Sequence, residues 1–375
     1  MLRMRIFSSM TSAGKRFLRS HYTITTGLEK ASFLFFLLLA AMLVSGCDHS
    51  PEIIRISGSK MGTSYHVTVV ADQPAPADLA EQIDQALSAV DQSMSTYKSQ
   101  SELSQFNRLP QSQQVVVSDQ FWAVLQTSEK IWRQSGGAFD PTVGPVVDLW
   151  GFGPQAGEDR IPDDSKIAAA LENTGFQHLV LNRADQAISK QKPIALDLSA
   201  VAKGYAVDQV AELLEMLALP DYLVEVGGEM RLSGSNPEGK PWRVAIEQPS
   251  LLPQVQQVIE IHSGAVATSG DYRNYFEKEG QRYSHTIDPR NGKPVTHKLA
   301  SVTVIADRCA DADAWATALT VLGEEEGMRL ANQYAIAVYM LIRDGADFRV
   351  TSSSAFKPYL QGSPDSQGPI DENRP

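Results

Sequence analysis

The stretch LDLSAVAKGYAVDQVAELLE, residues 196–215, predicts the end of a strand followed by an amphipathic helix. On a period of 3.6 residues, the helix carries one apolar stripe made by Ala206, Val210, Leu213 and Leu217. Lys203 lies beside this stripe and therefore points toward the packed side. With Ser199 as the N-cap, Lys203 falls near the first turn, where the helix dipole disfavours a cation. A bound anion would compensate this charge; alternatively, the lysine stem packs and its ammonium reaches water.

The first 46 residues have the pattern of an export signal. A segment rich in Arg and Lys precedes the apolar run Ala31–Val44. Its 14 residues fall short of the roughly 20 needed to span a bilayer. The run leads into LVSGC, which resembles a bacterial lipoprotein signal, so we expect Cys47 to become a lipidated N-terminus on a short tether, residues 47–52. An uncleaved anchor is the alternative. Asp48 resembles a retention signal, which favours the periplasmic face of the inner membrane.

Composition narrows the class of protein. The chain has 33 basic and 44 acidic residues. The first 46 residues hold six of the basic and one of the acidic ones, so the remainder has a net charge of −16. Because it has no basic patch or Lys/Arg run, nucleic acid is not an expected partner. Cys309 is the only cysteine besides Cys47, which excludes an internal disulfide framework within the mature chain.

Alternating strand and helix patterns predict one α/β or α+β domain over residues 53–360, with two subdomains around a cleft as an alternative. The tail, residues 361–375, has no apolar periodicity and is predicted to be disordered. The expected helices are Ala77–Met94, Phe121–Gln134 and Asp313–Leu322. The expected strands are Ile53–Gly58, Thr63–Ala71, Tyr222–Val226, Met230–Ser233, Trp242–Glu247, Val255–His262, Val302–Ala306, Ala335–Arg343 and Phe348–Thr351.

Two segments combine glycine or hydroxyl residues with an acid. The glycine-rich SGGAFDPTVGPVVDLWGFG, residues 135–153, lets the backbone approach a ligand closely, and within it Asp140 is either a ligand contact or a turn cap. Asp313 and Thr317 are four residues apart on one helix face. Together with a backbone carbonyl, their oxygens suit Mg²⁺, although a dipole-favoured Asp and a Thr bonded to its own helix explain the pair equally well.

A histidine and an acid follow a predicted strand in YSHTIDPRNGKPV, residues 283–295. His285 is the side chain best suited to acid or base chemistry near neutral pH. A hydrogen-bonding role in the core is the alternative for this single histidine.

Taken together, eight ordered motifs resemble the ApbE-like family, the FAD:protein FMN transferases. They begin at Met61 (MGTSYHVTV), Ser95 (STYKSQSELSQFN), Gly136 (GGAFDPTVGPVVDLWGFG), Leu196 (LDLSAVAKGYAVD), Val224 (VEVGGEM), Ala267 (ATSGDYRNYF), Ser284 (SHTIDPRNGKPV) and Ser301 (SVTVIADRCADADAWATALTVLG). The resemblance implies a compact T-fold-like domain. It also implies an enzyme that binds FAD with Mg²⁺, transfers FMN to a threonine of an acceptor protein and releases AMP.

The resemblance also assigns residues. Contacts to the flavin nucleotide are expected from Met61, Tyr97, Ala138, Phe139, Asp140, Asp197, Lys203 and Ile287. Mg²⁺ is expected on the Ala200 carbonyl, Asp313 and Thr317. His285 is the expected general base, with Asp288 or Asp313 as alternatives. Ala316 stands where some relatives carry an acid, which places more weight on Asp313 and Thr317.

The implied partners are flavin-bearing subunits of membrane redox complexes, of the sodium-pumping NADH:quinone reductase or Rnf type. Two other functions stay open at this stage. One is an FAD pyrophosphatase that yields FMN and AMP, and the other is a non-catalytic flavin-binding lipoprotein.

Overall fold

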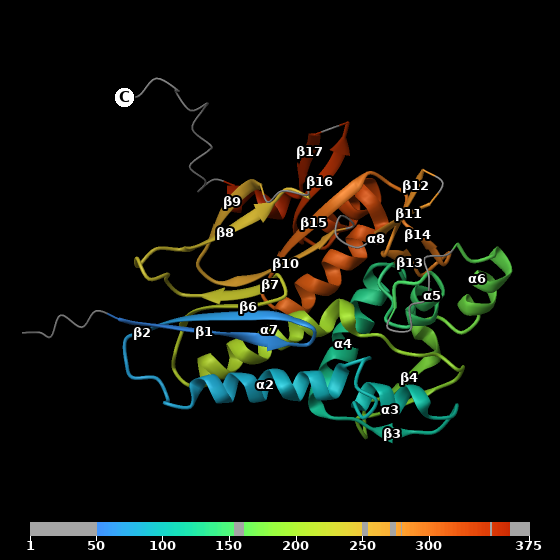
Figure 1. Cartoon of the computed structure of the whole chain (residues 1–375), viewed down its shortest axis with the longest axis horizontal. Helices are drawn as coiled ribbons and strands as arrows, with labels where there is room; N and C mark the ends of the chain where they lie inside the picture. The colour runs from blue at the N-terminus through green and yellow to red at the C-terminus, as the bar shows by residue number, and fades with distance from the viewer. Residues whose placement is uncertain are drawn as a thin grey trace, which may run out of the picture. The chain divides into compact units, whose positions relative to one another are not determined.

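An eight-stranded sheet, antiparallel throughout, forms the centre of this computed structural model (Figure 1). Its strand order is β1-β2-β6-β7-β10-β15-β16-β17. The bounds are β1 (Glu52–Lys60), β2 (Thr63–Ala71), β6 (Asp221–Val226), β7 (Glu229–Ser233), β10 (Gly264–Gly270), β15 (Leu299–Ala306), β16 (Ala337–Asp344) and β17 (Asp347–Ser352). With helices packed on it, this sheet makes the fold α+β, one of the two predicted classes.

The structure describes residues 51–153, 161–249, 254–270, 275–278, 280–345 and 347–360. The described residues from Pro51 onward form one compact unit, in agreement with the prediction of a single compact domain. The predicted signal, Cys47 and the tail lie outside the described residues. β1 begins at Glu52, the last residue of the predicted tether, so the two overlap by one residue. Of the helices described, none combines the length and apolarity that a membrane crossing requires.

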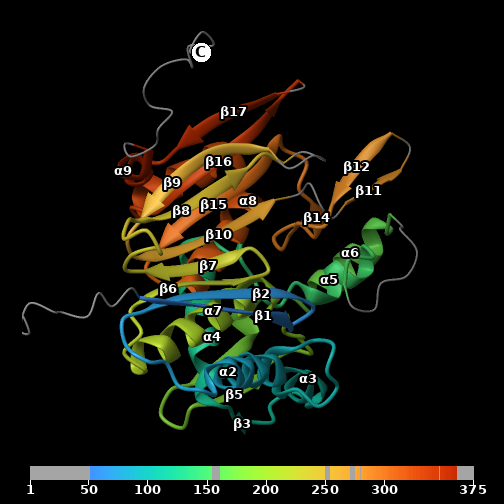
Figure 2. The same cartoon turned by 60° about the vertical axis from the view of Figure 1, so that its left-hand side comes forward.

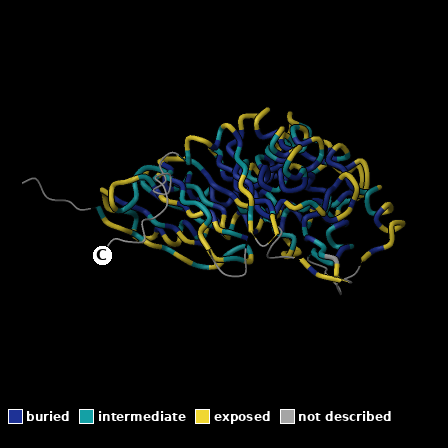
Figure 3. Tube along the Cα trace, turned by 90° about the horizontal axis from the view of Figure 1, so that it is seen from above, coloured by how far each residue is buried: buried dark blue, intermediate teal, exposed yellow. Residues whose placement is uncertain are grey.

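Two layers of helices cover one face of the sheet. α7 (Ser199–Met216) and α8 (Cys309–Gln333) pack against the strands, and α2 (Leu79–Met94) and α4 (Asp119–Gln134) pack on these two helices. Apolar side chains from all four helices and the inner strands make the main core. Figure 3 shows this buried interior in dark blue. α7 therefore has neighbours on several sides, which explains why its buried residues extend beyond the single predicted stripe.

A hairpin covers the opposite face of the sheet (Figure 2). β8 (Trp242–Glu247) pairs with β9 (Val255–Ile261), and the short η2 (Ser354–Phe356) and α9 (Lys357–Leu360) lie next to it. Alternate residues of β8 are buried, as its alternating sequence predicts. They form a second core with the outer sides of β10, β15 and β16.

A third, aromatic cluster lies beside the glycine-rich segment. Its buried members are Val146, Trp150, Ile167, Phe276 and Ile287. Trp150 directly follows α5 (Gly144–Leu149), and the other members come from α5, α6 (Asp164–Leu171), β11 (Tyr275–Lys278) and β13 (Ile287–Asp288). β11 pairs with β12 (Gln281–Ser284), and β13 pairs with β14 (Lys293–Pro294). The remaining described elements are α3 (Glu102–Arg108), β3 (Val115–Val116), η1 (Phe176–His178), β4 (Leu179–Asn182) and β5 (Ala187–Lys190).

Helices α7 and α8 touch through a glycine and a buried carboxylate. A Cβ atom on Gly204 would lie 2.4 Å from the Cys309 carbonyl oxygen, so only glycine permits this approach. Asp208 is fully buried and accepts hydrogen bonds from the N–H groups of Cys309 at 2.9 Å and Ala310 at 3.0 Å. These donors at a helix start have no partner within the helix itself. A side chain of α7 thus caps α8.

Two helices begin at other residues than predicted, and the remote cap explains the first of them. α8 begins at Cys309 instead of Asp313, which places Asp313 in the second turn. Ser199 is the first residue of α7 and not its N-cap. The Asp197 carboxylate accepts the Ser199 N–H at 2.9 Å, which is the role expected of a capping side chain.

Helix α8 is interrupted at Gly323, whose φ of 76° is not helical. His297 donates from Nε2 to the Thr320 carbonyl at 2.8 Å. That carbonyl would otherwise accept from residue 324 in a continuous helix. A Cβ on Gly323 would lie 2.8 Å from Cδ2 of the same histidine ring. His297 therefore satisfies one group released by the break and occupies the space beside it.

The Gly204 contact yields a test of stability. Helix propensity alone predicts that Gly204→Ala gains about 1 kcal/mol. Because the added methyl group collides with backbone atoms of α8, we expect instead a loss of about 1–3 kcal/mol in the free energy of unfolding. Urea denaturation measures this change. Met216→Ala, at a position on α7 that is 78% exposed, serves as the control and should change stability by less than about 0.5 kcal/mol. An unchanged or more stable Gly204→Ala protein would contradict the described contact.

Candidate functional site

The predicted site residues gather around one cavity of about 410 Å³. It lies where α7, α8, the glycine-rich segment and the ends of several strands meet. The predicted residues that line it are Ala138, Phe139, Asp140, Asp197, Ala200, Lys203, His285, Ile287, Asp313 and Thr317. Residues more than 170 positions apart in the sequence therefore face one space. Their proximity is an observation, whereas their individual roles stay predictions.

Lys203 forms an ion pair inside this cavity. Its ammonium donates to Oε1 of Glu229, a residue that is only 4% exposed. Burial opposes the charge on Lys203, but the carboxylates of Asp313 and Glu229 outweigh it and raise the pKa of the ammonium. Lys203 is therefore balanced by a carboxylate of the protein itself. Neither of the two predicted explanations, a bound anion or an ammonium that reaches water, included this partner for the charge of Lys203.

Glu229 is the residue that sequence reasoning missed. It is the first residue of β7 and lines the same cavity. The motif VEVGGEM contained it, but one strand gives no indication that its first residue faces a lysine on a distant helix. Burial, followed by the nearby charge of Asp313, raises the pKa of the Glu229 carboxyl, although Lys203 acts in the opposite direction.

Asp313 joins the two helices at the cavity. Its side chain is buried, and its Oδ2 accepts the Gly204 N–H at 3.0 Å. In an α-helix this N–H is the partner of the Ala200 carbonyl, so the carboxylate competes with that carbonyl for one donor. Burial raises the pKa of Asp313 despite the opposing effects of Lys203 and this hydrogen bond. Thr317 follows one turn later on α8 and is half-buried.

The oxygen groups here fit a hard divalent cation. A carboxylate, a hydroxyl and a backbone carbonyl are ligand types that Mg²⁺ accepts, with water and phosphate completing its shell. The two carboxylates of Asp313 and Glu229 have one ammonium between them, and Oε2 of Glu229 has no hydrogen-bond partner among the described residues. Among the residues that the structure describes, no group of three or more His, Cys, Asp or Glu side chains is arranged to hold a metal.

Asp140 organises the glycine-rich segment. Its Oδ1 accepts from the Thr142 N–H at 2.8 Å and from the Thr142 hydroxyl at 2.6 Å, and its Oδ2 accepts from the Phe176 N–H at 2.9 Å. Burial raises the pKa of this carboxyl, although these hydrogen bonds oppose the shift. Both oxygens are therefore used within the protein, as the turn-cap interpretation predicted. The residue still borders the cavity, next to Ala138 and Phe139.

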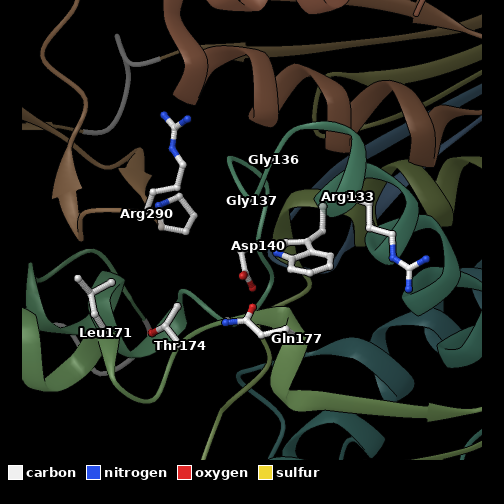
Figure 4. Close-up of a pocket in the computed structure, with 11 residues that line it drawn as sticks. Arg133, Gly136, Gly137, Asp140, Leu171, Thr174, Gln177 and Arg290 are labelled. Atoms are coloured by element: carbon white, nitrogen blue, oxygen red, sulfur yellow. The ribbon is translucent and has the colours of Figure 1, made fainter.

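A second cavity of about 500 Å³ adjoins the first, and the two share Asp140 and Pro289. Figure 4 shows it, with Asp140 near Gln177 and the Arg133 guanidinium directed away from them. Arg290, on its rim, donates from Nε at 2.9 Å and from Nη2 at 2.7 Å to Asp288. Asp288 is thus held by Arg290 and does not line the first cavity, which makes it a poorer base candidate than His285.

His285 reaches the cavity from the segment between β12 and β13. It is half-buried, and its ring meets Phe152 edge-on, with 6.4 Å between ring centres. Phe152 stacks on Phe276 at 5.4 Å, and Phe276 stacks on Tyr283 at 5.0 Å. This series of rings runs from the imidazole to Tyr283, two residues before His285, and packs against one side of the histidine.

Met61 and Tyr97 do not line the cavity. Met61 occupies the turn between β1 and β2 with a φ of 54°, followed by Gly62 at 75°. A non-glycine residue rarely adopts this backbone conformation, and such positions are enriched at functional sites. Tyr97 follows α2 and is 81% exposed. The nucleotide contacts of these two residues therefore stay predictions.

Comparisons with known proteins show the family to which this chain belongs. The model of the ApbE family matches residues 61–340. A protein of Vibrio cholerae serotype O1 named FAD:protein FMN transferase is 44% identical over 328 residues, which covers 86% of this chain and 97% of the relative. The protein of the same name from Escherichia coli K12 is 42% identical over 337 residues, covering 86% and 96%. A solved structure, the flavin transferase ApbE from Vibrio cholerae, has a TM-score of 0.77 and 43% identity over 83% of this chain and all of that one. This chain belongs to the ApbE family.

Proposed function

We propose that this protein is an FAD:protein FMN transferase that acts with Mg²⁺ on a threonine of an acceptor protein and releases AMP. One observation carries the proposal. A half-buried lysine, a buried carboxylate, a hydroxyl and a helix-start carbonyl line one cavity, on two helices held together by Gly204 and Asp208. A diphosphate with a divalent cation is the ligand that this combination of charges suits. The names of the relatives support the same activity.

The residues of the cavity would have different roles in the reaction. Asp313, Thr317 and the Ala200 carbonyl would hold Mg²⁺, which supplies charge neutralisation at the diphosphate. Lys203 adds a fixed positive charge at the same place. Phosphoryl-type transfer depends mainly on such positioning and neutralisation. The glycine-rich segment, held by the hydrogen bonds of Asp140, gives the cavity a wall on which backbone can approach the nucleotide.

The proposed transfer of FMN is a single nucleophilic substitution at phosphorus. The threonine oxygen forms a bond to the phosphorus of the FMN half of FAD, and the bond from this phosphorus to the bridging oxygen breaks. The bridging oxygen leaves with AMP. We assign the proton of the threonine hydroxyl to His285, because this residue lines the cavity and its ring packs edge-on against Phe152.

The cellular location of the reaction and its acceptor proteins are proposed from the sequence alone. Lipidation at Cys47 would attach the enzyme to the periplasmic face of the inner membrane. There it would meet flavin-bearing subunits of membrane redox complexes, of the sodium-pumping NADH:quinone reductase or Rnf type.

A single assay separates this function from its alternatives. The chain from Asp48 onward is incubated with FAD, Mg²⁺ and an acceptor that carries a Ser/Thr-Gly-Ala-Thr site, and acceptor mass and AMP are read together. We expect a mass gain of one FMN with matching AMP. Asp313→Asn should lower this rate by about 100-fold or more, because the cation loses its carboxylate. AMP without modified acceptor would indicate a pyrophosphatase instead, and FAD binding with neither product a storage protein.

The proposed base has its own test. His285→Ala should lower the transfer rate by about 10²–10⁴-fold while the affinity for FAD, measured by flavin fluorescence, stays within about two-fold. The matched control is His262→Ala, at an exposed residue outside the cavity, which should transfer FMN at the wild-type rate. If His285→Ala also transfers at that rate, the assignment of His285 is wrong.

A further inference from the structure

Glu229 is held in a fixed position by the turn before it. Gly227 and Gly228 have φ values of 61° and 100°, which favour glycine. A Cβ on Gly227 would lie 2.9 Å from Cγ2 of Thr63, so the turn packs closely on the start of β2. Glu229 follows directly and directs its carboxylate into the cavity that holds Lys203 and Asp313. None of the roles assigned so far uses this carboxylate.

The two oxygens of Glu229 differ in their surroundings. Oε1 accepts from the Lys203 ammonium. Oε2 is buried and has no hydrogen-bond partner among the described residues. A buried acceptor left without a partner costs about 1–3 kcal/mol, and such groups in native proteins call for an explanation. A ligand that donates a hydrogen bond in the cavity would provide one.

The charges of the cavity indicate what kind of ligand this is. Asp313 and Glu229 are both buried, and Lys203 is the cation that balances them among the residues described at this cavity. An excess of negative charge repels a phosphate oxygen at Oε2. A cation removes the excess, and its bound water supplies a donor that Oε2 lacks. Mg²⁺ in particular keeps several of its waters when it binds to proteins.

We propose that Glu229 is a positioning residue of the metal site, with Oε1 holding Lys203 and Oε2 accepting a hydrogen bond from a water on the divalent cation. The cation is the one that Asp313, Thr317 and the Ala200 carbonyl would hold, so this inference rests on the proposed function. Residues that bond to metal ligands in this way typically contribute 10–100-fold to metal affinity. Glu229 would connect the lysine and the cation, so that both meet the diphosphate in one arrangement.

The test measures Mn²⁺ binding to the full chain, because Mn²⁺ replaces Mg²⁺ on oxygen ligands and is visible by electron paramagnetic resonance. It is titrated alone and with FAD. Glu229→Gln keeps the shape of the side chain and removes its charge. We expect its Mn²⁺ affinity to fall by about 10-fold or more, with metal-free FAD affinity and thermal midpoint close to wild type. Asp311→Asn is the matched control, since it removes a carboxylate two residues from Asp313 that pairs with Lys130 outside the cavity.

The outcomes separate this inference from the proposed function. Wild-type Mn²⁺ affinity in Glu229→Gln overturns the role of Glu229 and leaves the transferase intact. Weaker metal-free FAD binding with unchanged Mn²⁺ affinity also overturns it, because Oε2 then contacts the nucleotide. If wild type binds Mn²⁺ in neither condition, the proposed metal site fails and this inference fails with it. Should Glu229→Gln not fold, Glu229→Asp decides: its retracted carboxylate should weaken Mn²⁺ binding several-fold, and undiminished affinity refutes the inference.

Discussion

The close contact between α7 and α8 is the constraint on which the site depends. Gly204 lets the two backbones meet, and Asp208 satisfies the donors at the start of α8. Only because of this approach does Asp313 on one helix reach the Gly204 N–H on the other. Lys203 and Ala200 on α7 then face the same space as Asp313. The cavity is thus a product of helix packing, with the sheet as its support.

Local sequence patterns predicted most strands of the sheet, but they did not predict where the helices begin. The first hairpin and the strands from Tyr222 to Ile261 follow alternation and glycine turns, both of which are short-range signals. The start of α8 was wrong by four residues because its cap, Asp208, lies about 100 positions away on another helix. α3, α5 and α6 are short and were not predicted. Few residues per helix give too little periodicity to detect.

The site shows the same division between local and distant information. The family motifs placed Lys203, Asp313 and Thr317 at one cavity, as the structure finds. The amphipathic pattern correctly indicated that Lys203 faces inward, but no spacing rule shows that Glu229 balances it. That pair depends on how β7 lies against α7, which is a property of the tertiary structure. Tyr97 shows a limit of the family motifs: a motif identifies a residue but does not predict where its side chain lies, and Tyr97 is exposed.

The break of α8 at Gly323 has a consequence for how the family can vary. Asp313, Thr317 and Val321, all at the cavity, precede the break and follow one another at intervals of one turn. In a continuous helix, an inserted or deleted residue rotates everything beyond it by about 100°. The break and its histidine separate the two halves, so length changes after Gly323 leave the cavity residues in register. Length changes in the second half of α8 are therefore limited by its own buried residues, Leu330 and Ala331, and not by the register of the cavity residues.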